Sequence, residues 1–361
     1  MNKNGPKRIL VYQTGSIGDT LVSLPVLNWI RSQYPSARLD LLCSSGNTGF
    51  SGPNELLGEC GLFNQIISYI PGRGFRQLSN AFHLFRRLRG QYDLAFYLIR
   101  SVPYWKQRSR RDLLFLNLLG IQHIRGIGNE FEFPVKRRGE KLPTLPTHTQ
   151  ILFQRLQHEG FPVPEKTEEY DLNMHFSQDE IAFAKKWMAQ KMSGKEGVPF
   201  AVGIGGKRQV CRWPRERYVE VLSRITEEFE LIPFFFGDSN DTQDIQKMQE
   251  SLPVGVNASG ELSLRQTVAI MHHCRFYLGN DTGSMHLAAV AGIPCVAIFS
   301  AHNYRGLWYP FGDKNNQILR ADCECENCRL QTCLHSPPSC LQMIGTEEVY
   351  QAVCQIRSQA E

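Results

Sequence analysis

The sequence predicts an α/β protein with two parallel sheets, each covered by helices. Its 361 residues are enough for about two domains that each bury a core. Short apolar runs of strand length alternate with stretches of helical periodicity, as in parallel sheets with helices on both faces. The alternation stops once, in a loose segment near the middle, and then begins again. We therefore expect domains at residues 1–190 and 191–345, followed by a helix at 346–361.

In the first half, the order of elements begins with a strand, a glycine loop and a helix. The strand is expected at residues 8–13 and the loop at 15–19, and Pro25 interrupts the early part of the helix that follows. Further strands are expected at residues 39–43, 65–70 and 94–99, and further helices at 75–89, 112–119 and 149–160.

The second half repeats this alternation. Strands are expected at residues 200–204, 231–236, 276–278 and 295–299, and helices at 215–228, 241–251, 263–273 and 283–291. In both halves the loops that follow strands are the positions where parallel sheets bind ligands.

Composition excludes several classes of protein. Hydrophobic residues make up 42% of the chain and charged residues 21%, which is ordinary for a globular protein and argues against a disordered or fibrous chain. The longest apolar run, residues 231–236, is far shorter than the ~20 residues of a membrane-spanning helix. The apolar stretch after the basic start is too short for a signal peptide, so we expect a cytoplasmic protein.

The first candidate loop contains Gly15, Gly18 and Asp19. Glycines let backbone N–H groups approach an anion at the start of a helix, which favours phosphate. The loop lacks the three glycines of a dinucleotide fingerprint and the lysine of a P-loop. Alternatively, Asp19 only caps the helix.

The second candidate loop combines Gly205 and Gly206 with Lys207 and Arg212. Two glycines after a strand and several cations suit a polyanion such as a diphosphate. The alternative is a surface loop in which Trp213 anchors the next helix.

The third candidate loop contains Asp281, Thr282 and Gly283 and runs into a helix that includes His286. A hydroxyl and free N–H groups at a helix start again suit an anion. Taken alone, His286 is more typical of a packed, hydrogen-bonded histidine than of a catalyst.

Together these motifs resemble glycosyltransferase family 9, the heptosyltransferases of lipopolysaccharide core synthesis. The resemblance covers nearly the whole chain and is carried by five segments, at residues 15–19, 92–95, 212–214, 281–289 and 297–299. It implies a GT-B fold, in which two Rossmann-like domains with parallel sheets face each other across a cleft. It also implies that the first domain binds the acceptor and the second the nucleotide-sugar.

The resemblance further implies an inverting, metal-independent transfer of a heptose or related sugar from an ADP-sugar to a lipopolysaccharide-core or related saccharide, with no cofactor required. Asp19 would be the general base. Donor-binding residues would be Gly18, Gly205, Gly206, Lys207, Arg212, Asp238, Asp281, Thr282, Gly283 and His286. Arg212 stands where the family commonly has lysine, and Asp238 is a weak match for the residue that binds the donor ribose. No Asp-x-Asp triplet occurs in the chain, which favours cations and helix N-termini as the groups that neutralise the diphosphate.

Two other functions fit parts of the sequence. A nucleotide-sugar-binding protein without turnover would need the same donor loops, although the intact Asp19 argues against it. A nicotinamide dehydrogenase would also have two Rossmann-like halves, but the glycine fingerprint is missing.

Five of the eleven cysteines lie within residues 323–340. The spacing Cys325-x2-Cys328-x4-Cys333-x6-Cys340 offers four soft ligands for a structural zinc or iron ion, with Cys323 left over. Packed free thiols or oxidised pairs are the alternatives.

Two basic groups could touch an anionic partner such as a phosphorylated lipid at the inner face of the membrane. They are Arg100, Lys106, Arg108, Arg110 and Arg111, and Lys136, Arg137, Arg138 and Lys141. The alternative is an ordinary solvated surface. We expect no nucleic acid partner.

Overall fold

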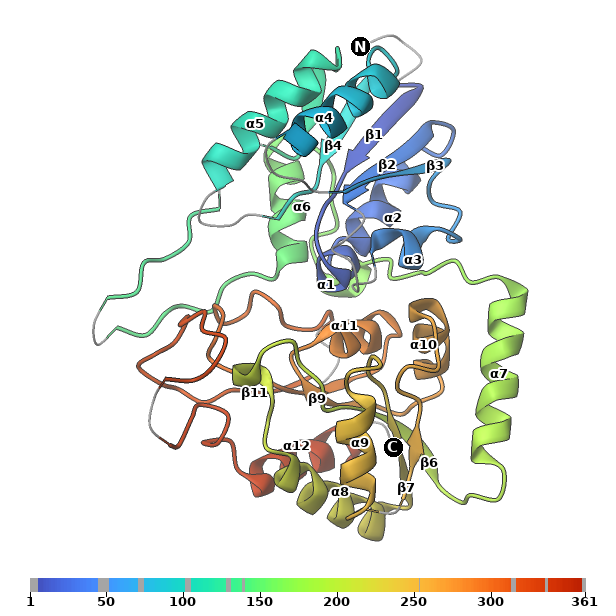
Figure 1. The fold of residues 1–361 in the computed structure, drawn as a ribbon, viewed down its shortest axis with the longest axis vertical. Coiled ribbons are helices and arrows are strands. Elements are labelled where there is room, and N and C mark those ends of the chain that lie inside the picture. Colours follow the sequence, from blue (N-terminus) through green and yellow to red (C-terminus); the bar gives the residue numbers. More distant parts are fainter. Residues whose placement is uncertain are drawn as a thin grey trace. The chain divides into compact units, whose positions relative to one another are not determined.

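Figure 1 shows the computed structural model of the chain. It describes residues 6–44, 52–70, 75–100, 105–127, 131–137, 140–252, 254–312, 316–334 and 337–358. The chain divides into two compact units, the first made of Met1–Val135 and Pro146–His175 and the second of Lys136–Leu145 and Phe176–Glu361. Among the described helices, none combines the length and the apolar character needed to cross a membrane.

The first unit is built on a five-stranded parallel sheet with the strand order β3-β2-β1-β4-β5. Its strands are β1 (Arg8–Tyr12), β2 (Arg38–Ser44), β3 (Gln65–Tyr69), β4 (Leu94–Tyr97) and β5 (His123–Arg125). Its helices are α1 (Ile17–Leu21), α2 (Leu24–Gln33), α3 (Pro53–Leu57), α4 (Phe75–Leu88), α5 (Trp105–Leu118) and α6 (His148–His158), with a 3-10 turn at Thr167–Glu169.

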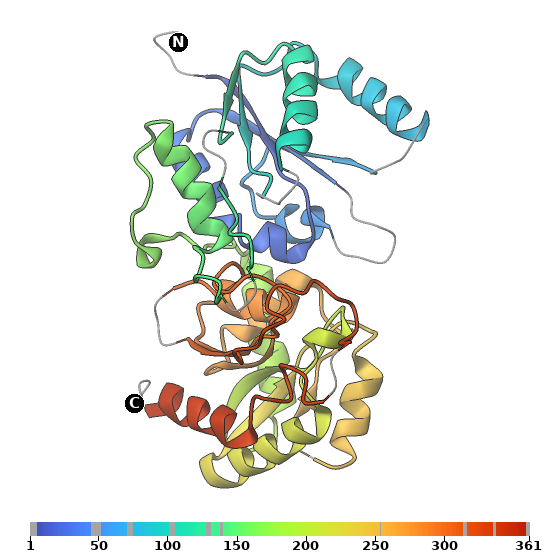
Figure 2. The same cartoon turned by 90° about the vertical axis from the view of Figure 1, so that its left-hand side faces the viewer.

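Helices cover both faces of this sheet. Figure 2 shows α4 and α5 on one side and α6 on the other. On the second side the ring of Trp29, in α2, packs edge-on against Phe96 of β4 and Phe153 of α6, with centroid distances of 6.5 and 6.3 Å. Because both faces are covered, the central strands β1 and β4 are continuous apolar runs that are buried almost throughout.

The predicted first helix is in fact two helices. α1 ends at Leu21 and α2 begins at Leu24, so that Pro25 lies in the first turn of α2. A proline is tolerated there because the first-turn N–H groups have no partner within the helix. The proline therefore starts a helix and does not interrupt one.

The second unit is built on a six-stranded parallel sheet with the order β11-β10-β9-β6-β7-β8. Its strands are β6 (Val198–Gly203), β7 (Leu231–Phe235), β8 (Val256–Asn257), β9 (Tyr277–Asn280), β10 (Cys295–Ile298) and β11 (Gln317–Leu319). Its helices are α7 (Gln178–Met192), α8 (Arg215–Phe229), α9 (Thr242–Gln249), α10 (Leu264–Met271), α11 (Gly283–Val290) and α12 (Thr346–Ser358), with a 3-10 turn at Gln209–Cys211.

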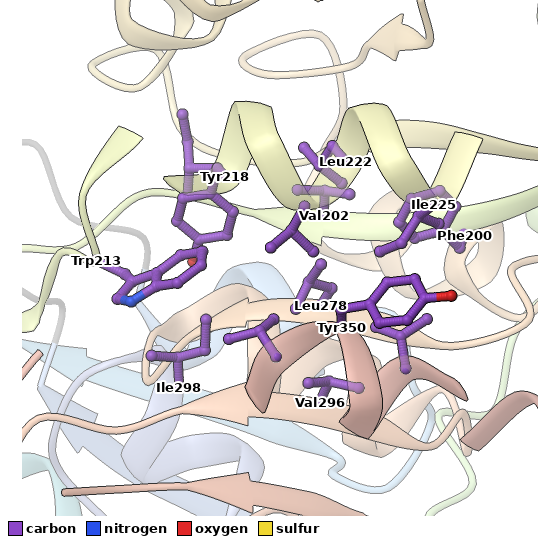
Figure 3. Close-up of a cluster of buried hydrophobic side chains, with 14 of the residues drawn as sticks. Phe200, Val202, Trp213, Tyr218, Leu222, Ile225, Leu278, Val296, Ile298 and Tyr350 are labelled. Atoms are coloured by element: carbon purple, nitrogen blue, oxygen red, sulfur yellow. The ribbon is translucent and has the colours of Figure 1, made fainter. Parts of the chain in front are cut away.

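The core of this unit lies between the sheet and the helices α8 and α12. In Figure 3 the side chains of Tyr218, Leu222 and Ile225 point from α8 toward the strands. Their spacing of three and four residues places them on one face of α8. Trp213 packs perpendicular to Tyr218 at a centroid distance of 4.9 Å, so the residues just before α8 are fixed to the core.

Helix α7 belongs to the second unit, whereas the predicted boundary at residue 190 lies inside this helix. Glu180 accepts two hydrogen bonds from the Arg265 guanidinium of α10, at 2.6 and 2.9 Å, and its side chain is only 14% exposed. Lys191 forms a second, more exposed ion pair with Glu261 at 3.0 Å. These contacts hold α7 on α10, and the chain divides at residue 175 instead.

We expect Arg265→Ala to lower the free energy of unfolding by about 2–3 kcal/mol, because it leaves Glu180 partly buried without its charged partner. The matched variant Lys191→Ala should cost about 0.5 kcal/mol or less, since that pair is exposed. Urea unfolding followed by circular dichroism measures both.

The pKa of Glu180 is lowered, chiefly by the hydrogen bonds from Arg265. This stabilisation is therefore present at neutral pH and lost as the pH falls through the lowered pKa. The difference between wild type and Arg265→Ala should shrink in acid, and a difference that stays constant there would contradict the assignment.

Candidate active site

Both sheets reverse their strand order at one place, between β1 and β4 in the first unit and between β6 and β9 in the second. Ligands of open α/β sheets bind beside the carboxyl ends of strands at such a reversal. All three loops predicted from the sequence follow strands that flank a reversal: the first follows β1, the second β6 and the third β9.

In the first unit, the Asp19 carboxylate lies at the reversal and is held firmly. Its Oδ2 accepts hydrogen bonds from the backbone N–H and the hydroxyl of Ser16, at 2.7 and 2.9 Å. Gly15 makes room for this arrangement, since its φ is +145° and a Cβ there would lie 2.4 Å from the carboxylate. The side chain of Asp19 therefore has one well-defined orientation.

This geometry corrects one expectation. Asp19 and Ser16 form a capping box, so the carboxylate itself occupies the start of α1, and Gly18 lies within that short helix. The carboxylate thus lies where the sequence analysis expected an anion, and a role of Gly18 in donor binding remains a prediction. Asp19 does cap the helix, as the alternative interpretation proposed, but only through Oδ2.

The second oxygen of Asp19 faces Arg100, which the sequence analysis had not assigned to the site. Arg100 follows β4, and its Nε lies 2.9 Å from Oδ1 of Asp19. Asp19 is only 6% exposed, while the side chain of Arg100 is 39% exposed. The ion pair is therefore open to solvent on the arginine side and is not an interior pair.

In the second unit, the loop after β6 passes close to α9. A Cβ at Gly205 would lie 2.3 Å from Oδ2 of Asp241, so the loop needs a glycine there. Arg212 joins the loop to α9, because its Nε donates to the Gly206 carbonyl at 2.8 Å and its Nη1 donates to Asp244 at 2.8 Å. The guanidinium is thus positioned at the loop and stays partly exposed.

Asn280, at the end of β9, joins this loop to the rest of the site. Its amide Nδ2 donates to the carbonyls of Ile204 and Gly205, at 2.8 and 3.1 Å. Its Oδ1 accepts from the Trp213 N–H and the Tyr218 hydroxyl, at 3.1 and 2.9 Å. All these groups are buried, so Asn280 fixes both ends of the loop that contains Gly205, Gly206 and Arg212.

The third loop leads directly into α11. Thr282 is the N-cap residue, but its side chain makes no capping hydrogen bond to the helix backbone. Its hydroxyl lies 2.8 Å from the Ser284 hydroxyl, which in turn lies 3.0 Å from the Tyr277 hydroxyl. A Cβ at Gly283 would meet no atom within 4 Å. This helix start is therefore bordered by open space, as an anion site requires.

Burial raises the pKa of Asp281, beside this helix start, to about 7. Arg320 and Arg208 act in the opposite direction by favouring the ionised form. A carboxyl group that titrates near neutral pH, next to an uncapped helix N-terminus, is typical of a functional site.

The other predicted donor residues lie in different surroundings. Asp238 is exposed in a turn after β7, where its carboxylate accepts from the Asn240 N–H at 2.8 Å, and Lys207 is exposed on the second loop. His286 is buried, with its ring edge-on to Trp308 at 5.7 Å. Their roles remain predictions.

The four cysteines predicted as metal ligands, Cys325, Cys328, Cys333 and Cys340, line one cavity of about 270 Å³. Within the described ranges, however, no three His, Cys, Asp or Glu side chains gather as a metal ion would require, so the geometry gives a structural zinc or iron no support. Cys323, left over in the predicted set, instead lies 3.4 Å from Cys325, sulfur to sulfur.

Several cations of the two basic groups have acidic partners. Arg100 pairs with Asp19, Arg108 and Arg111 lie beside Asp112, and Lys141 pairs with Asp322 at 2.7 Å. Arg138 and the side chain of Lys106 lie outside the described residues. Contact of these groups with an anionic lipid remains a prediction.

Known heptosyltransferases are similar to this protein in sequence and in structure. The lipooligosaccharide heptosyltransferase 2 of Haemophilus ducreyi is 25% identical over 312 residues, which cover 80% of this chain and 81% of that protein. A family 9 glycosyltransferase from Veillonella parvula has a similar structure, with a TM-score of 0.71 at 16% identity, covering 98% of this chain and 97% of that one. The E. coli heptosyltransferase WaaC with ADP gives 0.64 at 14% identity, covering 97% and 99%.

The structural likeness shows that the two parallel sheets are those of the GT-B heptosyltransferases, as predicted. The family model described as glycosyltransferase family 9 (heptosyltransferase) matches residues 116–337, which include the second and third loops and Cys325, Cys328 and Cys333. Because this match covers more than half of the chain, the protein belongs to glycosyltransferase family 9 and is a glycosyltransferase of the heptosyltransferase type.

Proposed function

We propose that the protein transfers a heptose from ADP-heptose to a lipopolysaccharide-core saccharide with inversion at the anomeric carbon, and that Asp19 is the general base. The first unit would bind the acceptor and the second the ADP-sugar. The observation that carries the proposal is the Asp19 carboxylate at the strand reversal, with Oδ2 fixed by Ser16 and Oδ1 facing the partly exposed Arg100. Relatives that act as lipooligosaccharide heptosyltransferases, and one solved with ADP, support the donor and the acceptor class.

On the acceptor side, the two oxygens of Asp19 have separate tasks. Oδ2 is occupied by the two hydrogen bonds from Ser16, which leaves Oδ1 to take the proton. An acceptor hydroxyl would replace Arg100 at Oδ1 and lose its proton there as it attacks the anomeric carbon. Arg100, 2.9 Å from Oδ1, would hold the carboxylate in place until the acceptor arrives.

On the donor side, the departing ADP needs positive charge around its diphosphate. The N–H groups of Gly283 and Ser284 at the start of α11 and the guanidinium of Arg212 would supply it. Arg212 is held by Asp244 and the Gly206 carbonyl, so it can replace the lysine common in the family if its outer N–H groups reach the phosphate.

We expect Asp19→Asn to lower kcat by about 10²–10⁴-fold, because an amide cannot accept the proton. ADP binding by the same variant should be unchanged, since the donor groups lie in the second unit. Product formation by mass spectrometry and ADP binding by calorimetry provide the two measurements.

Asp40→Asn is the matched control. Asp40 is a buried carboxylate of the same unit that accepts a hydrogen bond from the Tyr92 hydroxyl at 2.9 Å and pairs with Arg38. Its turnover should remain close to wild type in folded protein. If Asp19→Asn kept wild-type turnover, Asp19 would not be the base, and if wild-type protein bound ADP without transferring sugar, it would be a binding protein without turnover.

Asn280→Ala should weaken ADP binding roughly tenfold, because it releases the carbonyls of Ile204 and Gly205 and loosens the loop that positions Arg212. Asn316→Ala provides the comparison, since Asn316 also bonds three backbone groups, those of Cys295, Phe311 and Gly312. Both variants should lose thermal stability, but only Asn280→Ala should lose affinity. Equal losses of affinity would show that the effect is general.

Binding of the ADP-sugar should weaken as the pH rises through about 7, because Asp281 then becomes ionised beside the diphosphate. The diphosphate of an ADP-sugar does not titrate in this range, so the change reports on the protein. Asp281→Asn should bind ADP-heptose with nearly the same affinity at pH 6 and pH 8. A wild-type affinity that is flat between these values would remove Asp281 from the donor site.

A further inference from the structure

Arg155, in α6, is a charged residue in the interior of the first unit and is only 2% exposed. Burial lowers the pKa of its guanidinium to about 10, so the group is still protonated at neutral pH. Removing a charge from water is costly unless hydrogen bonds compensate for the lost hydration. The groups that Arg155 binds therefore show what the buried charge does.

The guanidinium of Arg155 binds the backbone where β4 ends. Its Nη1 donates to the Ile99 carbonyl at 3.0 Å, and its Nη2 donates to the Tyr97 carbonyl at 3.3 Å. β1 pairs with β4 as far as Tyr97, and the Leu98 N–H still donates to the Tyr12 carbonyl at 2.9 Å. The planar fork of Arg155 thus fixes the residues that directly follow the strand.

Arg100 starts from the peptide group that Arg155 holds. The Ile99 carbonyl belongs to the planar peptide bond between Ile99 and Arg100, so the hydrogen bond from Arg155 fixes the point from which the Arg100 side chain starts. Arg100 is the residue whose Nε lies 2.9 Å from Oδ1 of Asp19, and its side chain is 39% exposed. A long, partly exposed side chain has many rotamers, so its direction depends strongly on where its backbone is held.

A second residue of α6 holds the neighbouring strand. Glu159 accepts hydrogen bonds through Oε1 from the N–H groups of Gly126 and Ile127, at 2.9 and 3.2 Å. These two residues follow β5, which pairs with β4. A Cβ at Gly126 would lie 2.9 Å from the Tyr97 carbonyl oxygen, which Arg155 also binds. The C-terminal end of α6 therefore binds the carboxyl ends of β4 and β5 together.

We propose that Arg155 is a positioning residue of the transfer reaction, because it holds the segment after β4 so that Arg100 meets Oδ1 of Asp19. This role rests on the proposed function, in which Asp19 is the general base and Arg100 holds its carboxylate until the acceptor arrives. Since Arg155 is buried, it acts through Arg100 and not on the substrate. Its substitution should therefore impair the use of the acceptor and leave ADP binding by the second unit unchanged.

Arg155→Lys keeps the charge but replaces the fork with one ammonium group, which cannot hold both carbonyls in the same geometry. We expect kcat/KM for a truncated lipopolysaccharide core to fall about tenfold, because a displaced Arg100 no longer holds the base. Initial rates by mass spectrometry and ADP binding by calorimetry measure the two effects.

Arg31→Lys is the matched control. Arg31 is another arginine of the first unit that binds backbone carbonyls, those of Leu62 and Ala37, at 3.1 and 2.9 Å. These carbonyls precede β3 and β2, so they lie at the amino-terminal edge of the sheet and not at the edge of Asp19. Arg31→Lys should keep the wild-type kcat/KM.

A double-mutant cycle separates positioning from a general loss of stability. Arg100→Ala should itself lower kcat/KM for the acceptor, since Oδ1 of Asp19 then loses its partner. If Arg155 acts through Arg100, the double variant should be no worse than Arg100→Ala alone. Additive losses in folded protein would overturn the proposal, and so would a wild-type kcat/KM in Arg155→Lys or in Arg100→Ala.

Gly126→Ala provides a second variant if Arg155→Lys does not fold. Its methyl group would press on the Tyr97 carbonyl and leave the charge of Arg155 in place. It should also lower kcat/KM for the acceptor, and this loss should vanish when Arg100 is already alanine. A loss that persists there would contradict the role of Arg100.

Hydrogen exchange of residues 94–100 in the full chain tests the hold on the backbone without any substrate. Exchange should be faster in Arg155→Lys than in wild type and unchanged in Arg31→Lys, and equal rates in wild type and Arg155→Lys would refute the proposal. If wild-type protein bound ADP without transferring sugar, the proposed function would fail, while the exchange would still decide whether Arg155 holds the segment that leads to Arg100.

Discussion

The second unit of this glycosyltransferase depends on one buried amide. Asn280 is the last residue of β9, one of the two strands between which the order of the second sheet reverses. Its side-chain amide donates two hydrogen bonds and accepts two, and these bonds join the loop after β6 to the start of α8. Backbone carbonyls in such a place would otherwise lack partners, which is costly in the interior. The amide therefore converts a strand end into a rigid support for a glycine loop, and the position of Arg212 follows from that support.

Much of the fold could be predicted because its signals are local. Both sheets are buried on two faces, so their longer strands are continuous apolar runs, and the helices between them have clear periodicity. The strands that were missed, β5, β8 and β11, have three, two and three residues and leave no periodic pattern. The boundary was misplaced because the glycines at 194 and 197 look like a linker, whereas the contact of Glu180 with Arg265 joins residues far apart in the sequence.

The candidate site, too, could be predicted only where its signals are local. Asp19, the glycines of the second loop and the start of α11 could be identified because each lies in a short motif after a strand. Arg100 was grouped with surface cations, and its contact with Asp19 depends on β1 and β4 being neighbours in the sheet. Cysteine spacing predicted four metal ligands; these cysteines line one cavity, but among the described residues no three ligand side chains gather as a metal ion requires, since ligand geometry is set by the chain path and not by the intervals alone.

Gly15 has a consequence for how Asp19, the proposed base, can be altered. A side chain at that position would overlap the Asp19 carboxylate in its present orientation, so a substitution of Gly15 would displace it. Under the proposed function, the base would thus be oriented before the saccharide arrives. Redesign for a different acceptor hydroxyl would have to change the residues around Arg100 and keep the loop that contains Gly15 and Asp19.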